Sequence, residues 1–378
     1  MPYNHLVPLI SCAGREKGGT MEEKTFDEIM EEIAMGLKRD PEHDIAYLKE
    51  QMESYKDHPL AKEIARACGR LMWEVLPDEK RRELGKVIDN HESDSQSVID
   101  EATYNMKMGN MAKALEIIEP LAKKYDELAE SGWSQDDSES VYFNFRSPLD
   151  EVVWRVHSDE PRDVRKAVEP FCQVYFMYGS ALYEAGRHEE AIAALEKAVR
   201  WNPSDLTVRF EVGENYKKLG DMASYERVLD EAHPFIASAE DMARFHRSKG
   251  FMLVERESYK LAAAHLMYSL LYASSELALS EIMYIKMKCG EDYTDMTPET
   301  AADILEKAGE LGGPDRDTLG ALYTLIKSSI DNEDVGTAIQ SAINLYQLTG
   351  DEEIGNLARA LLDAVKQAEE EDGDSPSD

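Results

Sequence analysis

A pattern with a period of 34 residues runs through positions 172 to 233 and restricts the chain to a repeating helical architecture. Three pairs of small residues are identical at this spacing: Gly179/Gly213, Gly186/Gly220 and Ala198/Ala232. Small residues within a helix allow a neighbouring helix to approach closely. A glycine after the last turn adopts the left-handed conformation that ends a helix. The pattern therefore predicts two consecutive helical hairpins.

This helix-turn-helix pattern resembles the tetratricopeptide repeat. The positions that carry the resemblance are Tyr175, Tyr178, Gly179, Leu182, Gly186, Ala191, Leu195, Ala198 and Pro203, then Val212, Gly213, Tyr216, Gly220, Leu229 and Ala232. The resemblance implies an all-α fold, a right-handed α-solenoid of helical hairpins that binds a protein or peptide. Residues 95 to 290 are also similar to a group of uncharacterised bacterial tetratricopeptide proteins, which implies no particular chemistry.

Further units extend the solenoid over residues 93–368. Ala102, Gly109 and Ala114 match the offsets of Gly179, Gly186 and Ala191. A unit centred on Gly250 starts 37 residues after its predecessor, so its hairpin is longer. Weaker patterns predict helices over 276–289, from 298 onward, and over 316–330, 334–348 and 351–368.

The N-terminal part lacks this repeat. Residues 1–20 carry no periodic pattern and are expected to be a poorly ordered leader, with Met21 as a candidate natural start. Apolar residues at helical spacing predict about four helices over 21–92. Two interpretations stay open for this region: a divergent helical N-terminal cap of the solenoid, or a separate effector bundle.

An irregular, aromatic insertion interrupts the repeats at 131–161. The segment from Val141 to Phe145 indicates a short extended piece, and Ser147 followed by Pro148 and Asp150 is typical of a helix start. Leu149, Val152, Val153 and Val156 form the predicted buried stripe of that helix. Trp133, Tyr142, Phe143 and Phe145 either wedge against the helices or face a ligand.

Charge limits the partners of this chain. With 42 basic and 76 acidic residues the formal charge is −34, which disfavours nucleic acid and anionic membrane surfaces. The sequence holds no stretch of eighteen apolar residues and no secretory signal, so a cytoplasmic location is expected. Four scattered cysteines are expected to be reduced. Residues 369–378 are predicted to be an acidic disordered tail.

No catalytic motif emerges from the sequence. It lacks HExxH, GxSxG, GxxxxGK and GxGxxG patterns, and we expect neither enzymatic activity, nor a cofactor, nor a bound metal. His43 lies among Asp40, Glu42 and Asp44, but these residues follow the pattern of a helix start. An enzyme with an unrecognised site is the least favoured alternative.

The resemblance implies that the first helix of each pair lines a concave groove. The groove residues it implies are Phe176, Ser180, Tyr183, Phe210, Glu214, Lys217, Arg244, Arg247 and Phe251. These aromatic and basic side chains suit an acidic or C-terminal carboxylate-bearing segment with an apolar anchor. Alternatively they pack on the adjacent helix or on the acidic tail of the chain. The residue pattern does not supply the carboxylate clamp of chaperone-binding domains, and a peptide-responsive bacterial regulator is the alternative function.

Overall fold

The computed structural model describes residues 25–56, 58, 60–77, 80, 95–130, 134–310 and 312–373. The chain divides into two compact units, Met1–Ile88 and Asp89–Asp378. The predicted leader at 1–20 and the candidate start at Met21 lie outside the described residues.

The first unit contains three helices in its described part: α1 (Phe26–Met35), α2 (Pro41–Ser54) and α3 (Ala61–Val75). Their shared core consists of Ile29, Ile33, Leu48, Ile64 and Cys68. Thr25 and Glu28 form a capping box at the start of α1, and the Asp40 side chain accepts from the Glu42 amide at the start of α2. The acidic residues around His43 thus begin a helix, as their pattern indicates. The role of this unit as a cap or a separate bundle stays a prediction.

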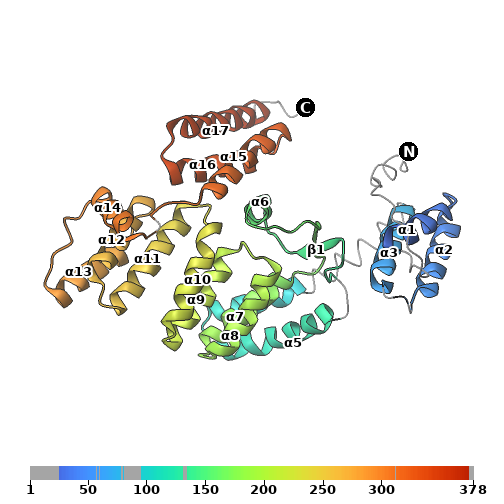
Figure 1. Cartoon of the computed structure of the whole chain (residues 1–378), viewed down its shortest axis with the longest axis horizontal. Coiled ribbons are helices and arrows are strands. Elements are labelled where there is room, and N and C mark those ends of the chain that lie inside the picture. Colours follow the sequence, from blue (N-terminus) through green and yellow to red (C-terminus); the bar gives the residue numbers. More distant parts are fainter. Residues whose placement is uncertain are drawn as a thin grey trace, which may run out of the picture. The chain divides into compact units, whose positions relative to one another are not determined.

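The second unit is built mainly from antiparallel helical pairs (Figure 1). A helix over 95–107 precedes α5 (Met111–Glu130). After the insertion come α7 (Phe171–Glu184), α8 (His188–Trp201), α9 (Leu206–Leu219), α10 (Met222–Ala232), the short 3-10 helix η1 (His233–Phe235), α11 (Ala239–Glu255) and α12 (Tyr259–Tyr272). Each helix packs on the next, so the region is an all-α solenoid of tetratricopeptide type.

The small residues of the repeat act as the sequence predicts. A methyl group placed on Gly179 would lie 2.6 Å from Cγ of Leu195, so α7 and α8 approach more closely than alanine permits. Gly186 and Gly220 have φ angles of 73° and 74° at the ends of α7 and α9. This left-handed conformation is strained for residues with a Cβ atom. The predictions of close helix crossing and glycine termination are confirmed.

The insertion forms a small β-α-β unit rather than a loop with one helix. β1 (Ser140–Phe143) pairs in parallel with β2 (Asp163–Lys166), and Ser140 lies opposite Asp163. Between the strands runs α6 (Pro148–Val156), which Ser147 caps by accepting from the Asp150 amide. The extended piece and the helix were predictable from local signals, whereas β2 was not because its residues alone carry no strand pattern.

One residue of the predicted stripe on α6 is misassigned. Val156 is exposed, while Trp154 is buried against Phe143 and Phe145. The helix turns its tryptophan toward the small sheet because the three aromatic rings bury more apolar surface together than Val156 offers. Phe143 and Phe145 therefore pack mainly within the insertion on Trp154, rather than wedging against the repeat helices as the first interpretation expected. Trp133 lies outside the described residues.

Five further helices complete the second unit: α13 (Glu276–Cys289), α14 (Pro298–Ala308), α15 (Arg316–Asp331), α16 (Val335–Thr349) and α17 (Glu352–Gly373). α17 continues past residue 368 into the segment predicted to be disordered, because its alanine and glutamate residues are good helix formers. Residues 374–378 lie outside the described part.

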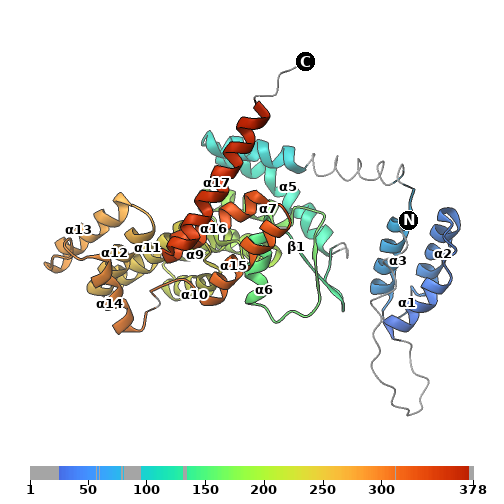
Figure 2. The same ribbon diagram turned by 90° about the horizontal axis from the view of Figure 1, so that it is seen from above.

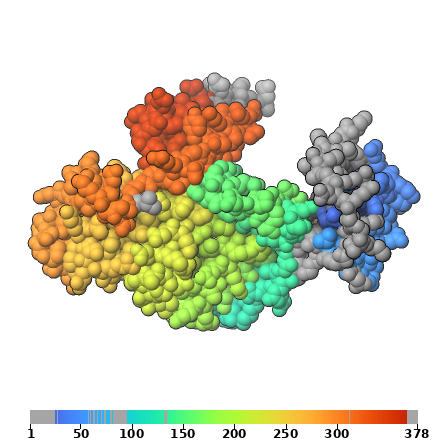
Figure 3. Space-filling view, viewed as in Figure 1, coloured from blue at the N-terminus to red at the C-terminus, as the bar shows by residue number. Residues whose placement is uncertain are grey.

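The insertion contacts the C-terminal helices, although about half of the second unit separates them in sequence. α6 packs against α15, and Figure 3 shows the green insertion beside the orange helices. His157 Nε2 lies 2.9 Å from Thr318 Oγ1, and that hydroxyl donates to the Pro234 carbonyl. His233 Nε2 also lies 3.1 Å from the Gly313 carbonyl oxygen. These contacts hold α15 against the insertion and η1.

Candidate binding face

The nine groove residues implied by the sequence lie on three successive first helices. Phe176, Ser180 and Tyr183 are on α7; Phe210, Glu214 and Lys217 are on α9; Arg244, Arg247 and Phe251 are on α11. We call this set the first-helix face. Phe210 is buried and the other eight residues are partly buried, so the face is semi-accessible rather than open.

Two cation–π contacts join α9 to α11 across this face. Lys217 Nζ lies 4.0 Å from the ring centroid of Phe251. The guanidinium carbon of Arg244 lies 4.6 Å from the ring centroid of Phe210. Each such contact contributes about 0.5–2 kcal/mol, depending on how far water is excluded. The aromatic and basic residues thus pack on the adjacent helix, which is the second of the sequence-based interpretations for these four side chains.

Acidic residues of α9 neutralise part of the basic cluster. Lys217 Nζ lies 3.4 Å from Glu214 Oε2, three residues earlier on the same helix. Arg244 donates to Glu211 Oε1 at 3.2 Å. Glu211 was not among the predicted residues, because the offsets of a single helix do not reveal which side chain a neighbouring helix meets.

Arg247 differs from its neighbours on the face. The Arg247 side chain is only partly exposed, and it forms no ion pair or hydrogen bond with any described residue. Burial lowers the pKa of its guanidinium from the ordinary value, and the positive charge of Arg244 lowers it further. The Glu240 carboxylate offsets part of this lowering, and Arg247 is the basic residue of the face that forms no ion pair within the described residues.

The α7 end of the face is held by contacts with the next helices. The Tyr183 ring meets the His188 ring edge-on at 5.4 Å, and His188 Nδ1 lies 3.0 Å from Asn215 Oδ1. Burial raises the pKa of Tyr183, and Glu214 and Glu211 raise it further, so the phenol stays neutral. Phe176 packs against the core around α5 and α7. Tyr183 is accordingly a fixed, neutral aromatic edge beside the charged residues.

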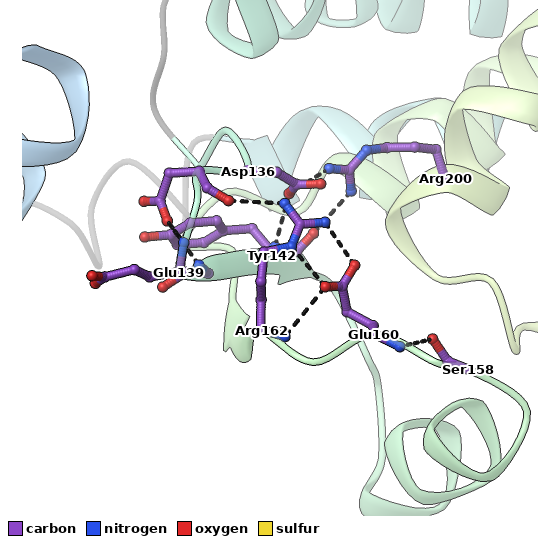
Figure 4. Close-up of polar contacts among 9 residues, drawn as sticks. Asp136, Glu139, Tyr142, Ser158, Glu160, Arg162 and Arg200 are labelled. Atoms are coloured by element: carbon purple, nitrogen blue, oxygen red, sulfur yellow. Dashed lines mark hydrogen bonds and ion pairs between the residues drawn. The ribbon is translucent and has the colours of Figure 1, made fainter. Parts of the chain in front are cut away.

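A second polar cluster fastens the insertion to α8 (Figure 4). Arg162 donates to both carboxylate oxygens of Glu160, at 2.7 and 2.6 Å, and to the Asp137 carbonyl at 2.8 Å. Arg200 binds Asp136 at 2.8 Å and the Tyr142 carbonyl at 2.9 Å, above the Trp201 ring. Since these groups satisfy one another, the cluster is a structural clasp.

His157, Asp315 and Asp317 bring ligand-type atoms within 4.8 Å of one another. The Asp315 carboxylate already accepts from the amides of Asp317 and Thr318 at the start of α15. His157 Nε2 is engaged with Thr318. Because the Asp315 carboxylate and His157 Nε2 have partners in the fold, we assign these two residues to the capping and docking of α15. The sequence could not reveal this group because its members meet only through the contact between α6 and α15.

The stacked hairpins define a helical-repeat protein. Residues 173–205 match the family model described as "Tetratricopeptide repeat", which covers α7 and α8. The chain therefore carries a tetratricopeptide repeat where its sequence pattern is clearest. No curated protein matches the sequence.

One solved structure similar to this chain is titled "Crystal structure of APC/C hetero-tetramer Cut9-Hcn1". The identity is 12%, the TM-score is 0.35, and the match covers 89% of this chain and 56% of that chain. This chain thus spans little more than half the length of that one, and a likeness at this level carries no conclusion about function. Within the described residues, no helix is both long and apolar enough to cross a membrane.

Proposed function

We propose that this protein is a non-catalytic scaffold that holds a peptide or a segment of a partner protein on the first-helix face, on the concave side of the repeats. The observation that carries the proposal is Arg247, a partly buried guanidinium without an ion pair in the described part of the chain. A binding partner with a carboxylate would supply the missing negative charge. The tetratricopeptide match is the independent support for a binding role.

The chemistry of the face favours an acidic group beside an apolar side chain. A carboxylate accepts well from a guanidinium, and the pairing strengthens where water is already partly removed. Arg244 stands one helical turn from Arg247 and keeps guanidinium N–H donors free for a ligand, because Glu211 engages only part of its donor fork. Phe251 and Tyr183 supply fixed aromatic surface for the apolar anchor.

Rigidity of the face reduces the entropic cost of binding. Lys217 and Arg244 are held against Phe251 and Phe210, so they lose little freedom when a ligand arrives. The excess of acidic residues elsewhere on the chain repels acidic peptides from other surfaces. Binding is thereby directed to the few positions where positive charge is uncompensated.

A displayed library of random peptides with free C-termini tests this function. Selection on the wild-type protein is expected to enrich peptides with an acidic group next to an aromatic or aliphatic residue. Arg247→Glu is expected to weaken their binding at least tenfold, since a hydrogen bond to a charged group contributes about 1.5–3 kcal/mol. Circular dichroism verifies that the variant is folded.

The matched control is Arg227→Glu on α10, where Arg227 forms an exposed pair with Glu231. This variant carries the same change of charge away from the face and is expected to bind like the wild type. Equal affinity of the Arg247→Glu and wild-type proteins for every enriched peptide would exclude the proposed face.

A further inference from the structure

The outward side of α13 exposes large apolar side chains along its whole length. Leu277, Met283 and Met287 are 66%, 61% and 84% exposed, and Leu279 and Tyr284 are also exposed. The inward side, formed by Ala278, Ile282 and Ile285, is fully buried in the core of the second unit. α13 is thus apolar on both sides, which is typical of a helix between two partners.

No described element of the second unit covers this outward side. α14 follows α13 in sequence but packs mainly on α12, so α13 lacks the hairpin partner that a regular repeat provides. Both views place α13 at the end of the second unit (Figures 1 and 2). The apolar residues therefore stand where a solenoid would continue into its next helix.

The charges of α13 are arranged so that the helix complements itself. Glu276 and Glu281 occupy its first half, and Lys286 and Lys288 occupy its last part. The helix is neutral, in a chain of formal charge −34. A second copy placed antiparallel would set the acidic half of one helix beside the basic half of the other, and it would also oppose the two helix dipoles favourably.

The apolar stripe has the same twofold symmetry. Leu277, Ser280, Tyr284 and Met287 follow the spacing of a coiled-coil seam. Leu277 and Met287 lie equally far along the chain from position 282, as do Ser280 and Tyr284. An antiparallel copy would therefore pair Leu277 with Met287 at both ends of the contact and would set the Tyr284 ring over the small Ser280 near its centre. The Ser280 hydroxyl already donates to the Glu276 carbonyl, so its burial would leave no unpaired donor.

We propose that the outward side of α13 is the contact by which two copies of this chain associate, antiparallel and about a twofold axis at the level of residue 282 along the helix. A helix of this length is about 21 Å long. The contact is therefore smaller than a standard stable interface. The dimer is accordingly reversible, and salt favours it by screening the overall negative charge of the two copies.

Sedimentation velocity of the full chain over a range of concentrations tests the apolar part of the proposal. The wild type is expected to shift from monomer to dimer, and Met287→Glu is expected to weaken association at least tenfold. Met108→Glu is the matched control, because Met108 is an exposed methionine in the turn between the helix over 95–107 and α5, and this variant is expected to associate like the wild type.

Two charge variants test whether α13 meets a second α13. Glu276→Lys/Glu281→Lys makes the helix wholly basic, and Lys286→Glu/Lys288→Glu makes it wholly acidic. Each protein alone is expected to remain monomeric, whereas their mixture is expected to associate at least as well as the wild type. Circular dichroism of each variant verifies the fold.

Three results would overturn the proposal. The first is a wild-type protein that stays monomeric at every concentration. This result would overturn the proposal even if hydrogen exchange then showed that residues 1–88 protect α13. The second is a dimer that Met287→Glu leaves unchanged. The third is a mixture of the two charge variants that does not associate while both are folded.

Discussion

The glycines at the centres of the first helices give a test of how closely the helices pack. Gly179, Gly213 and Gly250 occupy equivalent places in three successive repeats, so the sequence treats them alike. Their surroundings differ. An added methyl group would lie 2.6 Å from Leu195 Cγ at Gly179 and 2.7 Å from Leu266 Cγ at Gly250, but 3.1 Å from the edge of the Tyr225 ring at Gly213.

Replacing each glycine by alanine combines two opposing effects. Alanine in a helix interior is favoured over glycine by about 1 kcal/mol. Overpacking a well-filled site costs about 1–3 kcal/mol. At Gly179 and Gly250 the methyl group meets the branched carbon of a leucine and also lies 3.3 Å from a backbone carbonyl oxygen that cannot move aside, so the full cost is expected. At Gly213 a shift of the ring edge by a few tenths of an ångström relieves the contact.

Gly320→Ala is the reference variant that separates the gain in helix propensity from the cost of overpacking. Gly320 lies within α15 and has no heavy atom within 4 Å of the added methyl group, so only the gain in helix propensity remains. The free energy of unfolding, from urea titration followed by circular dichroism, is expected to decrease in the order Gly320→Ala, Gly213→Ala, then Gly250→Ala and Gly179→Ala. The first and last should differ by about 1–3 kcal/mol, the overpacking cost alone. Equal stability of Gly179→Ala and Gly320→Ala would refute this reasoning.

Two further predictions concern polar side chains, one buried pair and one at the surface. Burial lowers the pKa of His246 well below its usual range, with His265 adding to the effect, and burial also lowers the pKa of His265, whose Nδ1 lies 2.9 Å from that of His246. The unfolded chain therefore binds protons that the folded chain does not, and the free energy of unfolding should fall as pH drops below about 6.5, by up to about 1.4 kcal/mol per pH unit for each histidine. A urea midpoint that is constant between pH 7.5 and about 5.5 would contradict this assignment. At the contact between α8 and the insertion, Arg200→Ala removes the ion pair to Asp136 and the hydrogen bond to the Tyr142 carbonyl. Amide hydrogens of β1 should then exchange at least tenfold faster, while those of α12 stay unchanged. Unchanged exchange in β1 would show that the clasp does not hold the sheet.

The local features of this chain were predictable because each depends on residues close in sequence. The glycine ends of α7 and α9, the Ser147 cap of α6 and the bounds of α7 to α12 follow from side-chain spacing and backbone preferences. The match of residues 173–205 to the tetratricopeptide repeat agrees with the same pattern. The implied positions of the first-helix face also proved to lie on α7, α9 and α11.

What the sequence by itself determined is therefore a series of helical hairpins and the helices that carry the candidate face. Only the tertiary structure decided which side chains meet: that β2 pairs with β1, that α6 packs on α15, and that Arg244 reaches Glu211 while Arg247 has no such partner. It also decided that α14 turns away to α12 and leaves α13 apolar on its outward side. The physical reason is range, since helix formation is set within a few residues, whereas burial and charge pairing depend on elements brought together from distant parts of the chain.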